Sequence, residues 1–112
     1  MFHMLTCFDL RSEYTIDEFQ QALAEFTAQL KSHDLVCACG PIGRRRRHPV
    51  MDTDTERNHE YFFIMSFMNH AQCDRAIEHV RPDHGPGDSL HSTTYSKIEN
   101  AIFICWEDIA DE

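Results

Sequence analysis

The sequence predicts an α+β domain with four strands and two helices in the order β-α-β-β-α-β. Three observations lead to this fold class: one long apolar run near the middle of the chain, two segments with helical spacing of apolar residues, and alternating runs towards both ends. The 112 residues are enough for one domain with a single core, which we place at residues 1–112.

The apolar run lies between Glu60 and Met68 and contains neither proline nor charge after its first residue. Tyr61, Phe63, Met65 and Phe67 would point to one face of a strand, and Phe62, Ile64 and Ser66 to the other. Edge strands usually carry charge or proline, so this run predicts a central strand buried on both faces.

Three other segments have strand character. Residues 2–10 alternate, residues 35–39 are apolar up to Gly40-Pro41, and residues 101–106 alternate at the end of the chain. Residues 43–58 form a long polar connection without predicted structure.

Thr15 and Glu18 have the spacing of a capping box, which predicts that the first helix begins here. Its apolar stripe, which should end near Ser32, consists of Ile16, Phe19, Leu23, Phe26 and Leu30. Asn69 is the predicted cap of a second helix, which Pro82 limits to about Val80. Residues 83–88 predict a loop, and residues 89–96 a short helical turn.

This order of elements is the ferredoxin-like split βαβ pattern, in which two helices cover one face of an antiparallel sheet. Leu5, Cys7, Phe62 and Ile64 then lie on the uncovered face. A bare apolar face of this size needs a partner surface, and a twofold homodimer formed through this open sheet face is the simplest closure.

Composition excludes several classes of protein. Ten basic residues against nineteen acidic ones give a net charge of −9, which opposes binding to nucleic acid or to anionic membranes. Five cysteines are an odd count without metal or redox spacing, so we expect free thiols in a reducing compartment. The first residues do not resemble a signal peptide, and a cytoplasmic protein is expected.

Arg44 to Arg47 are four consecutive arginines. Such a run can grip phosphate or carboxylate groups. Asp52, Asp54 and Glu56 follow closely and favour a solvated loop with partly neutralised charge.

Residues 78–91 hold the candidate chemistry. His84 follows a proline in a glycine-rich loop with Asp83 and Asp88 nearby, where an imidazole can act as base or acid at neutral pH, or simply shape the turn. Glu78 can orient His84 if it faces a pocket, although Ile77 and Val80 define the apolar side of this helix. The spacing of His79, His84, Asp88 and His91 matches no metal template, and no metal site is predicted.

One short motif carries a resemblance. Arg81-Pro82-Asp83-His84 is followed by Gly87-Asp88. This segment and the order of elements resemble the dimeric α/β-barrel superfamily, in particular its stress-responsive group, which includes relatives of a plant polyketide cyclase, and uncharacterised marine bacterial members. That group typically carries His-Pro-x-His followed by a Gly-Asp pair.

The resemblance implies a homodimeric barrel whose catalytic base, if it is an enzyme, is His84, with no cofactor. Arg81 stands where the motif has its first histidine, with His79 nearby, and Glu78 stands where the cyclase has a catalytic tyrosine.

We therefore expect a small, apolar or aromatic polyketide-like ligand between sheet and helices. Candidate ligand-binding residues are His79, Asp88, Phe19, Phe26 and Trp106, whereas the orientation of His3 is left open. Two alternatives remain: a cofactor-free monooxygenase activity, and a non-catalytic stress or interaction protein whose barrel is only a dimer core.

Overall fold

The computed structural model describes residues 1–82 and 87–109. Its strands are β1 (Phe2–Leu10), β2 (Ala38–Cys39), β3 (Gly43–Arg44), β4 (Tyr61–Phe67) and β5 (Ile98–Glu107), and its helices are α1 (Ile16–Ser32), α2 (His70–His79) and α3 (Asp88–Tyr95). The sheet order is β2-β4-β1-β5, with β3 also paired to β4 and every pairing antiparallel. This is the predicted α+β ferredoxin-like fold, and β4 is central as predicted.

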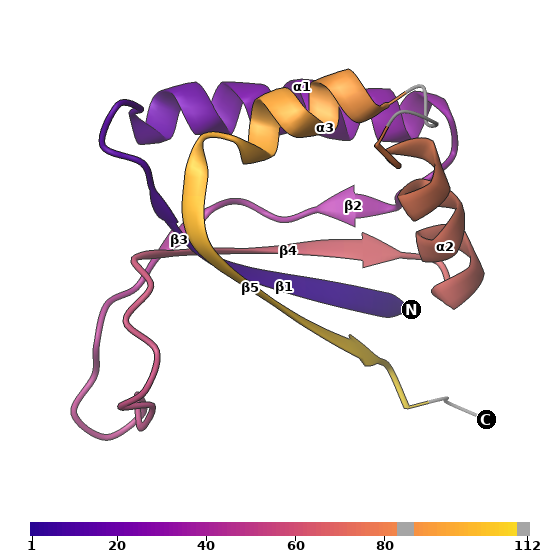
Figure 1. The fold of residues 1–112 in the computed structure, drawn as a ribbon. Coiled ribbons are helices and arrows are strands. Elements are labelled where there is room, and N and C mark those ends of the chain that lie inside the picture. The colour runs from indigo at the N-terminus through magenta and orange to yellow at the C-terminus, as the bar shows by residue number, and fades with distance from the viewer. Residues whose placement is uncertain (83–86, 110–112) are drawn as a thin grey trace.

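The molecule has two layers (Figure 1), and its extents are 47 × 43 × 19 Å. The helices lie on one side of the sheet and leave the other side open. The core between the layers contains Phe8, Phe19, Leu23, Phe63 and Met65. No helix in the described ranges is long and apolar enough to cross a membrane.

The helix starts follow from the sequence. Thr15 caps α1, since its hydroxyl accepts from the Glu18 amide at 3.2 Å and the Glu18 carboxylate accepts from the Thr15 amide at 3.0 Å. Asn69 caps α2 by accepting from the Gln72 amide at 2.9 Å. The predicted turn at residues 89–96 is a complete helix, α3, of 8 residues.

Two strand predictions need correction. Leu35 and Val36 are buried but not in a strand, because the Leu35 amide still bonds to the Leu30 carbonyl and Asp34 has a positive φ of 56°. Through this bond Leu35 closes the C-terminal turn that follows α1, so β2 begins only at Ala38 and has two residues. Conversely, Gly43 and Arg44, expected in an unstructured connection, pair with Phe62 and Tyr61 of β4.

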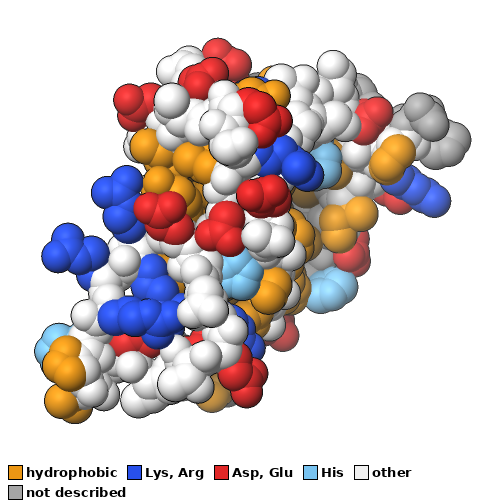
Figure 2. Space-filling view, turned by 60° about the vertical axis from the view of Figure 1, so that its left-hand side comes forward, with side chains coloured by type: hydrophobic (Ala, Val, Ile, Leu, Met, Phe, Trp, Pro, Cys, Tyr) orange, Lys and Arg blue, Asp and Glu red, His pale blue; other side chains and the backbone are white. Residues whose placement is uncertain are grey.

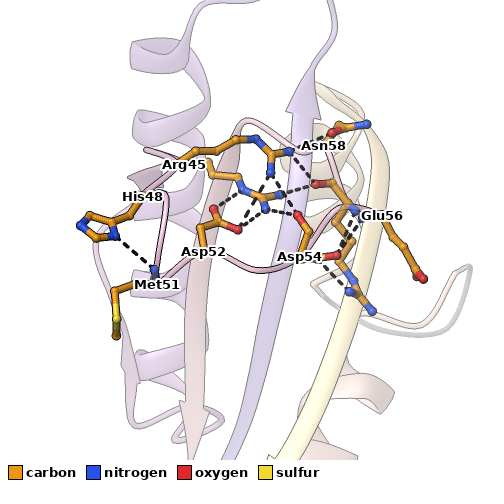
Figure 3. A network of polar contacts seen from close by, with 9 residues as sticks. Arg45, His48, Met51, Asp52, Asp54, Glu56 and Asn58 are labelled. Atoms are coloured by element: carbon orange, nitrogen blue, oxygen red, sulfur yellow. Dashed lines mark hydrogen bonds and ion pairs between the residues drawn. The ribbon is translucent and has the colours of Figure 1, made fainter.

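Residues 45–60, which we call the arm, extend from the sheet on the side away from the helices (Figure 1). Arg45 holds the arm together and its side chain is only 11% exposed. Its guanidinium donates to both carboxylate oxygens of Asp52, at 2.7 and 2.9 Å, and to the carbonyls of Asp54 and Arg57 (Figure 3). The prediction of a solvated arginine run is therefore wrong for Arg45.

The open face of the sheet is apolar, as predicted. Cross-strand pairing aligns Leu5 with Ile64 and with Ile104, and the latter two side chains are each 38% exposed. Ile102 and Trp106 on the same face are each 40% exposed. Cys7 differs because it is buried, and the charged groups of Arg57 and Arg45 at the base of the arm lie near its thiol.

Candidate ligand-binding cavity

A cavity of about 340 Å³ lies between the sheet and all three helices. It sits on the helix-covered face because cross-strand partners point to the same side of a sheet. Phe2 pairs with Phe67, and Met4 pairs with both Met65 and Cys105. The sheet therefore supplies Phe2, Met4, Met65, Phe67, Phe103 and Cys105, and α1 supplies Phe26 and Leu30.

The cavity opens to solvent beside β5. Phe103, on the helix side of β5, is 49% exposed, and Ile77 of α2, which also lines the cavity, is 56% exposed. Cys105 is exposed as well. A ligand can thus enter between β5 and the helices without passing through the core.

Two polar side chains of α3 line the cavity among these apolar groups. His91 and Tyr95 are one helical turn apart, and their ring centroids are 4.7 Å apart. Both pack against Phe26, whose ring centroid lies 5.5 Å from His91 and 5.9 Å from Tyr95. Within the described ranges, neither the imidazole nor the phenol forms a hydrogen bond to another protein group.

Burial sets the protonation state of both groups. It lowers the pKa of His91, a change that the nearby Asp88 carboxylate partly opposes, and it raises the pKa of Tyr95. Both shifts favour the neutral form, because burial disfavours charge. At neutral pH the cavity therefore presents a neutral imidazole and a neutral phenol.

Two polar side chains of α2 lie at the rim of the cavity. His70 and Asp74 of α2 form a pair at 3.1 Å, with both side chains more than half exposed, and Phe2 packs edge-on against His70 at 5.0 Å. Deeper in the wall, burial raises the pKa of the Cys73 thiol, which keeps it protonated.

The expected lining residues separate into three locations. Phe26 lies in the cavity wall. Phe19 is fully buried in the core, with its ring 4.8 Å from that of Phe8, and does not line the cavity. Trp106 lies on the opposite face of the sheet, where its ring stacks near His3 at 5.1 Å.

The same contacts settle the orientation of His3, which faces the open side. Its ring nitrogens contact the Ser66 hydroxyl at 2.8 Å and the Asp108 carboxylate at 2.9 Å.

Three candidate site residues at the end of α2 and the start of α3, Glu78, His79 and Asp88, do not line the cavity. Glu78 is 66% exposed and pairs with Arg81 at 2.9 Å. His79 is buried, with its ring 4.8 Å from that of His33. Asp88 begins α3 and accepts from the Ser92 hydroxyl at 3.2 Å. His84, the predicted base, lies outside the described residues.

Sequence reasoning did not assign His91 and Tyr95 to the cavity. Their spacing of four residues was a usable signal, because it places both on one face once residues 89–96 are taken as a full helix. The sequence suggests His91 only as a member of a histidine set whose spacing matches no metal site. In the described ranges no three His, Cys, Asp or Glu side chains are placed to hold a metal ion.

A second hollow of about 340 Å³ lies between α1 and residues 39–42. Its lining includes Gln20, Thr27 and Lys31, with no aromatic residue. Aromatic and apolar walls with a few converging polar groups are typical of ligand sites, so the cavity beside α3 is the stronger candidate.

Comparisons with known proteins identify the fold. No family model matches the sequence, and a search of curated proteins finds no match. The solved structure of the Arabidopsis thaliana protein At3g17210 superimposes with a TM-score of 0.72 at 7% identity, covering 100% of this chain and 99% of that one.

Two further structures are similar over nearly their whole length. A dimeric ferredoxin-like protein of unknown function from Jannaschia sp. CCS1 has a TM-score of 0.64 at 17% identity, covering 96% of this chain and 98% of that one. An antibiotic biosynthesis monooxygenase has a TM-score of 0.60 at 14% identity, covering 98% and 100% respectively. The chain thus has the ferredoxin-like fold of the dimeric α/β-barrel proteins, as the sequence predicts.

Proposed function

We propose that the protein is a homodimer in which each protomer binds a small, predominantly apolar molecule in the cavity beside α3. The observation that carries this proposal is the cavity itself, which combines aromatic walls with two neutral polar groups that lack a hydrogen-bond partner in the described ranges. Its volume of about 340 Å³ is at the lower end of the range for ligand pockets, which suits a molecule of one or two rings.

The open sheet face supports the homodimer. Ile64, Ile102, Ile104 and Trp106 expose 38–40% of their surface on one side of the sheet. The similar protein from Jannaschia is described as dimeric. The arm extends on the same side as this face (Figure 1), so a second copy seated there would also meet the arm.

For catalysis, we propose a cofactor-independent reaction on an aromatic, polyketide-like ligand with His84 as general base. This step rests on the resemblance of residues 81–88 to the barrel motif. The likeness to an antibiotic biosynthesis monooxygenase supports an oxygenation reaction as the second candidate.

Binding is tested with a neutral fluorescent probe, N-phenyl-1-naphthylamine, titrated into the wild type and two variants. Cys105→Trp places an indole in the cavity from its exposed side and should abolish binding. The matched control is Ala71→Trp, on the exposed side of α2 and away from the cavity lining, which should bind like the wild type. Equal binding by both variants, or none by the wild type, contradicts the proposal.

Catalysis is tested with His84→Ala in a panel of aromatic and polyketide-like compounds. A general base contributes on the order of 10²–10⁴-fold to rate, so turnover should fall by that factor while probe binding remains. If the wild type binds these compounds but converts none of them, the catalytic proposal is wrong and the protein is a non-catalytic carrier or interaction protein.

A further inference from the structure

We propose that the cavity selects uncharged ligands that carry a hydroxyl or carbonyl group, which His91 and Tyr95 bind, and that it rejects carboxylates and phosphates. This inference rests on the proposed function and names the chemical class of its ligand.

The first support is the charge of the cavity. None of the described lining residues is Lys or Arg, and the one carboxylate among them, Asp74, stands at the rim. Transferring an anion into apolar surroundings without a cation is costly. An anionic ligand entering past Asp74 would meet repulsion first, and the described lining residues offer it no cationic partner afterwards.

His70 does not remove this barrier. Its ring already contacts Asp74 at 3.1 Å, and its side chain is 68% exposed. A histidine in this position is solvated and already committed to a carboxylate, and a surface pair of this kind contributes little.

The second support is the unused hydrogen-bonding capacity of α3. A neutral imidazole offers one donor and one acceptor, and a phenol offers an O–H donor and acceptor lone pairs. Neither group has a partner in the described part of the chain, although both stand among aromatic rings. Polar groups in apolar surroundings are normally paired, so the partner is expected to come from the ligand.

The charged and titratable groups facing this pair favour the same ligand class. Asp88 on α3 is the charged group that acts on His91, the Cys39 thiol is the titratable group that acts on Tyr95, and α1 contributes Phe26. Asp88 does not line the cavity, but its negative charge acts on His91 and disfavours an anion beside that ring. A neutral hydroxyl satisfies both members of the pair, because it donates to one and accepts from the other.

The test compares three ligands of nearly equal size: naphthalene, 2-naphthol and 2-naphthoate. Calorimetric titration near neutral pH should give an affinity for 2-naphthol about fivefold higher than for naphthalene, since one net hydrogen bond is worth about 1 kcal/mol. The affinity for 2-naphthoate should be the lowest of the three.

Variants assign the effect to residues. Tyr95→Phe removes only a hydroxyl and should reduce the naphthol advantage while leaving naphthalene binding unchanged; His91→Phe should do the same. Tyr14→Phe is the matched control, since Tyr14 contacts Lys97 outside the cavity. Cys105→Arg adds a cation to the cavity wall from its exposed side and should make 2-naphthoate the preferred ligand.

The outcomes separate this inference from the proposed function. Equal binding of 2-naphthoate and 2-naphthol, or an unchanged naphthol advantage in Tyr95→Phe, overturns the selectivity while the cavity remains a binding site. If none of the three ligands binds, both proposals fail.

Discussion

Gly87 is the residue immediately before α3 and contacts the end of α2. Its amide donates to the His79 carbonyl at 2.8 Å. A Cβ atom at this position would lie 2.4 Å from Cδ2 and 2.6 Å from Nε2 of the His79 ring, and His79 is itself buried. The absence of a side chain at Gly87 therefore allows α3 to pack against the end of α2.

Gly87→Ala should destabilise the protein by about 1–3 kcal/mol, the usual cost of forcing extra volume into a packed site. Urea denaturation measures this loss. Gly43→Ala is the matched control, because its Cβ would approach nothing closer than 3.9 Å. Equal stability of the two variants would show that the His79 ring moves aside freely.

His79 should make stability depend on pH. Burial lowers its pKa, and His33 beside it acts in the same direction, whereas in the unfolded chain the pKa returns to about 6.5. The unfolded state then binds a proton more readily than the folded state. Above the pKa of the unfolded chain, His79 is neutral in both states and does not affect stability. As pH decreases from there towards the lower pKa of the folded protein, the unfolded state gains the proton first and the free energy of unfolding falls.

We expect His79→Gln to lose less stability than the wild type when pH is lowered from neutral through this window. Urea denaturation at several pH values measures the two slopes. Identical slopes would mean that the His79 ring is protonated as easily in the folded protein as in the unfolded chain.

At the scale of elements, hydrogen bonds between arginine and aspartate side chains hold the arm in its conformation. The Arg45 guanidinium holds the pKa of Asp52 below its usual range, and Arg57 lowers the pKa of Asp54 to about 2. At the outer end, His48 accepts from the Val50 and Met51 amides at 3.1 Å. These bonds give a connection of sixteen residues one defined conformation without secondary structure.

Arg45→Ala should lower the melting temperature by several degrees and expose the arm to proteolysis. Asp52 loses both hydrogen bonds from Arg45, and the carbonyls of Asp54 and Arg57 are left with their bonds from Arg47. Arg46→Ala is the matched control next to it, because Arg46 is exposed and makes no hydrogen bond or ion pair in the described ranges. Thermal melts and limited trypsin digestion compare the two variants. If the arm is equally resistant to trypsin in both, the prediction is wrong.

The elements with strong local signals were predictable. The run at Tyr61–Phe67 and the capping box at Thr15 each combine a pattern with a boundary, and both appear where expected. The pairing of Gly43 with Phe62 had no local signal, because a strand of two residues exists only through its neighbour. Likewise, the sequence does not indicate which of the four adjacent arginines forms the hydrogen bonds to Asp52.

The cavity was predictable only as a general location between sheet and helices. Phe19 and Phe26 share one helical stripe, yet Phe19 packs into the core and Phe26 lines the cavity. That difference depends on where α3 crosses α1 rather than on periodicity. The position of Trp106 could not be predicted without the register of β5 against β1. That register pairs Trp106 with His3 and places its side chain on the open face.

At the scale of the whole molecule, the open face should decide the oligomeric state. We expect Ile64→Glu to be monomeric or to aggregate in sedimentation experiments at micromolar concentration, because a carboxylate in the middle of an apolar interface lacks a partner. The control is Ala71→Glu, on the exposed side of α2. A monomeric wild type would refute the dimer.

We expect the outer end of the arm to make a second contact in the proposed dimer. Val50 and Met51 are 71% and 79% exposed, and Figure 2 shows apolar side chains gathered at this end beside basic ones. Exposing two neighbouring large apolar side chains on an ordered arm has a cost in water, which a second copy would remove. The exposed apolar side chains on the open face of β5, Ile102 and Ile104, are the apolar surface that we expect them to contact on the partner.

The double variant Val50→Asp, Met51→Asp should therefore weaken the dimer without unfolding the protomer. Burying each of these side chains is worth about 1.5–3 kcal/mol, so their loss should raise the dissociation constant at least tenfold. Sedimentation velocity over a concentration series measures that constant, and a thermal melt checks that the fold is intact. Because Arg45 and Asp52 fix the arm in place, Arg45→Ala should weaken the dimer in the same direction. A double variant that associates as tightly as the wild type would place the arm outside the interface and leave the sheet face as the whole contact.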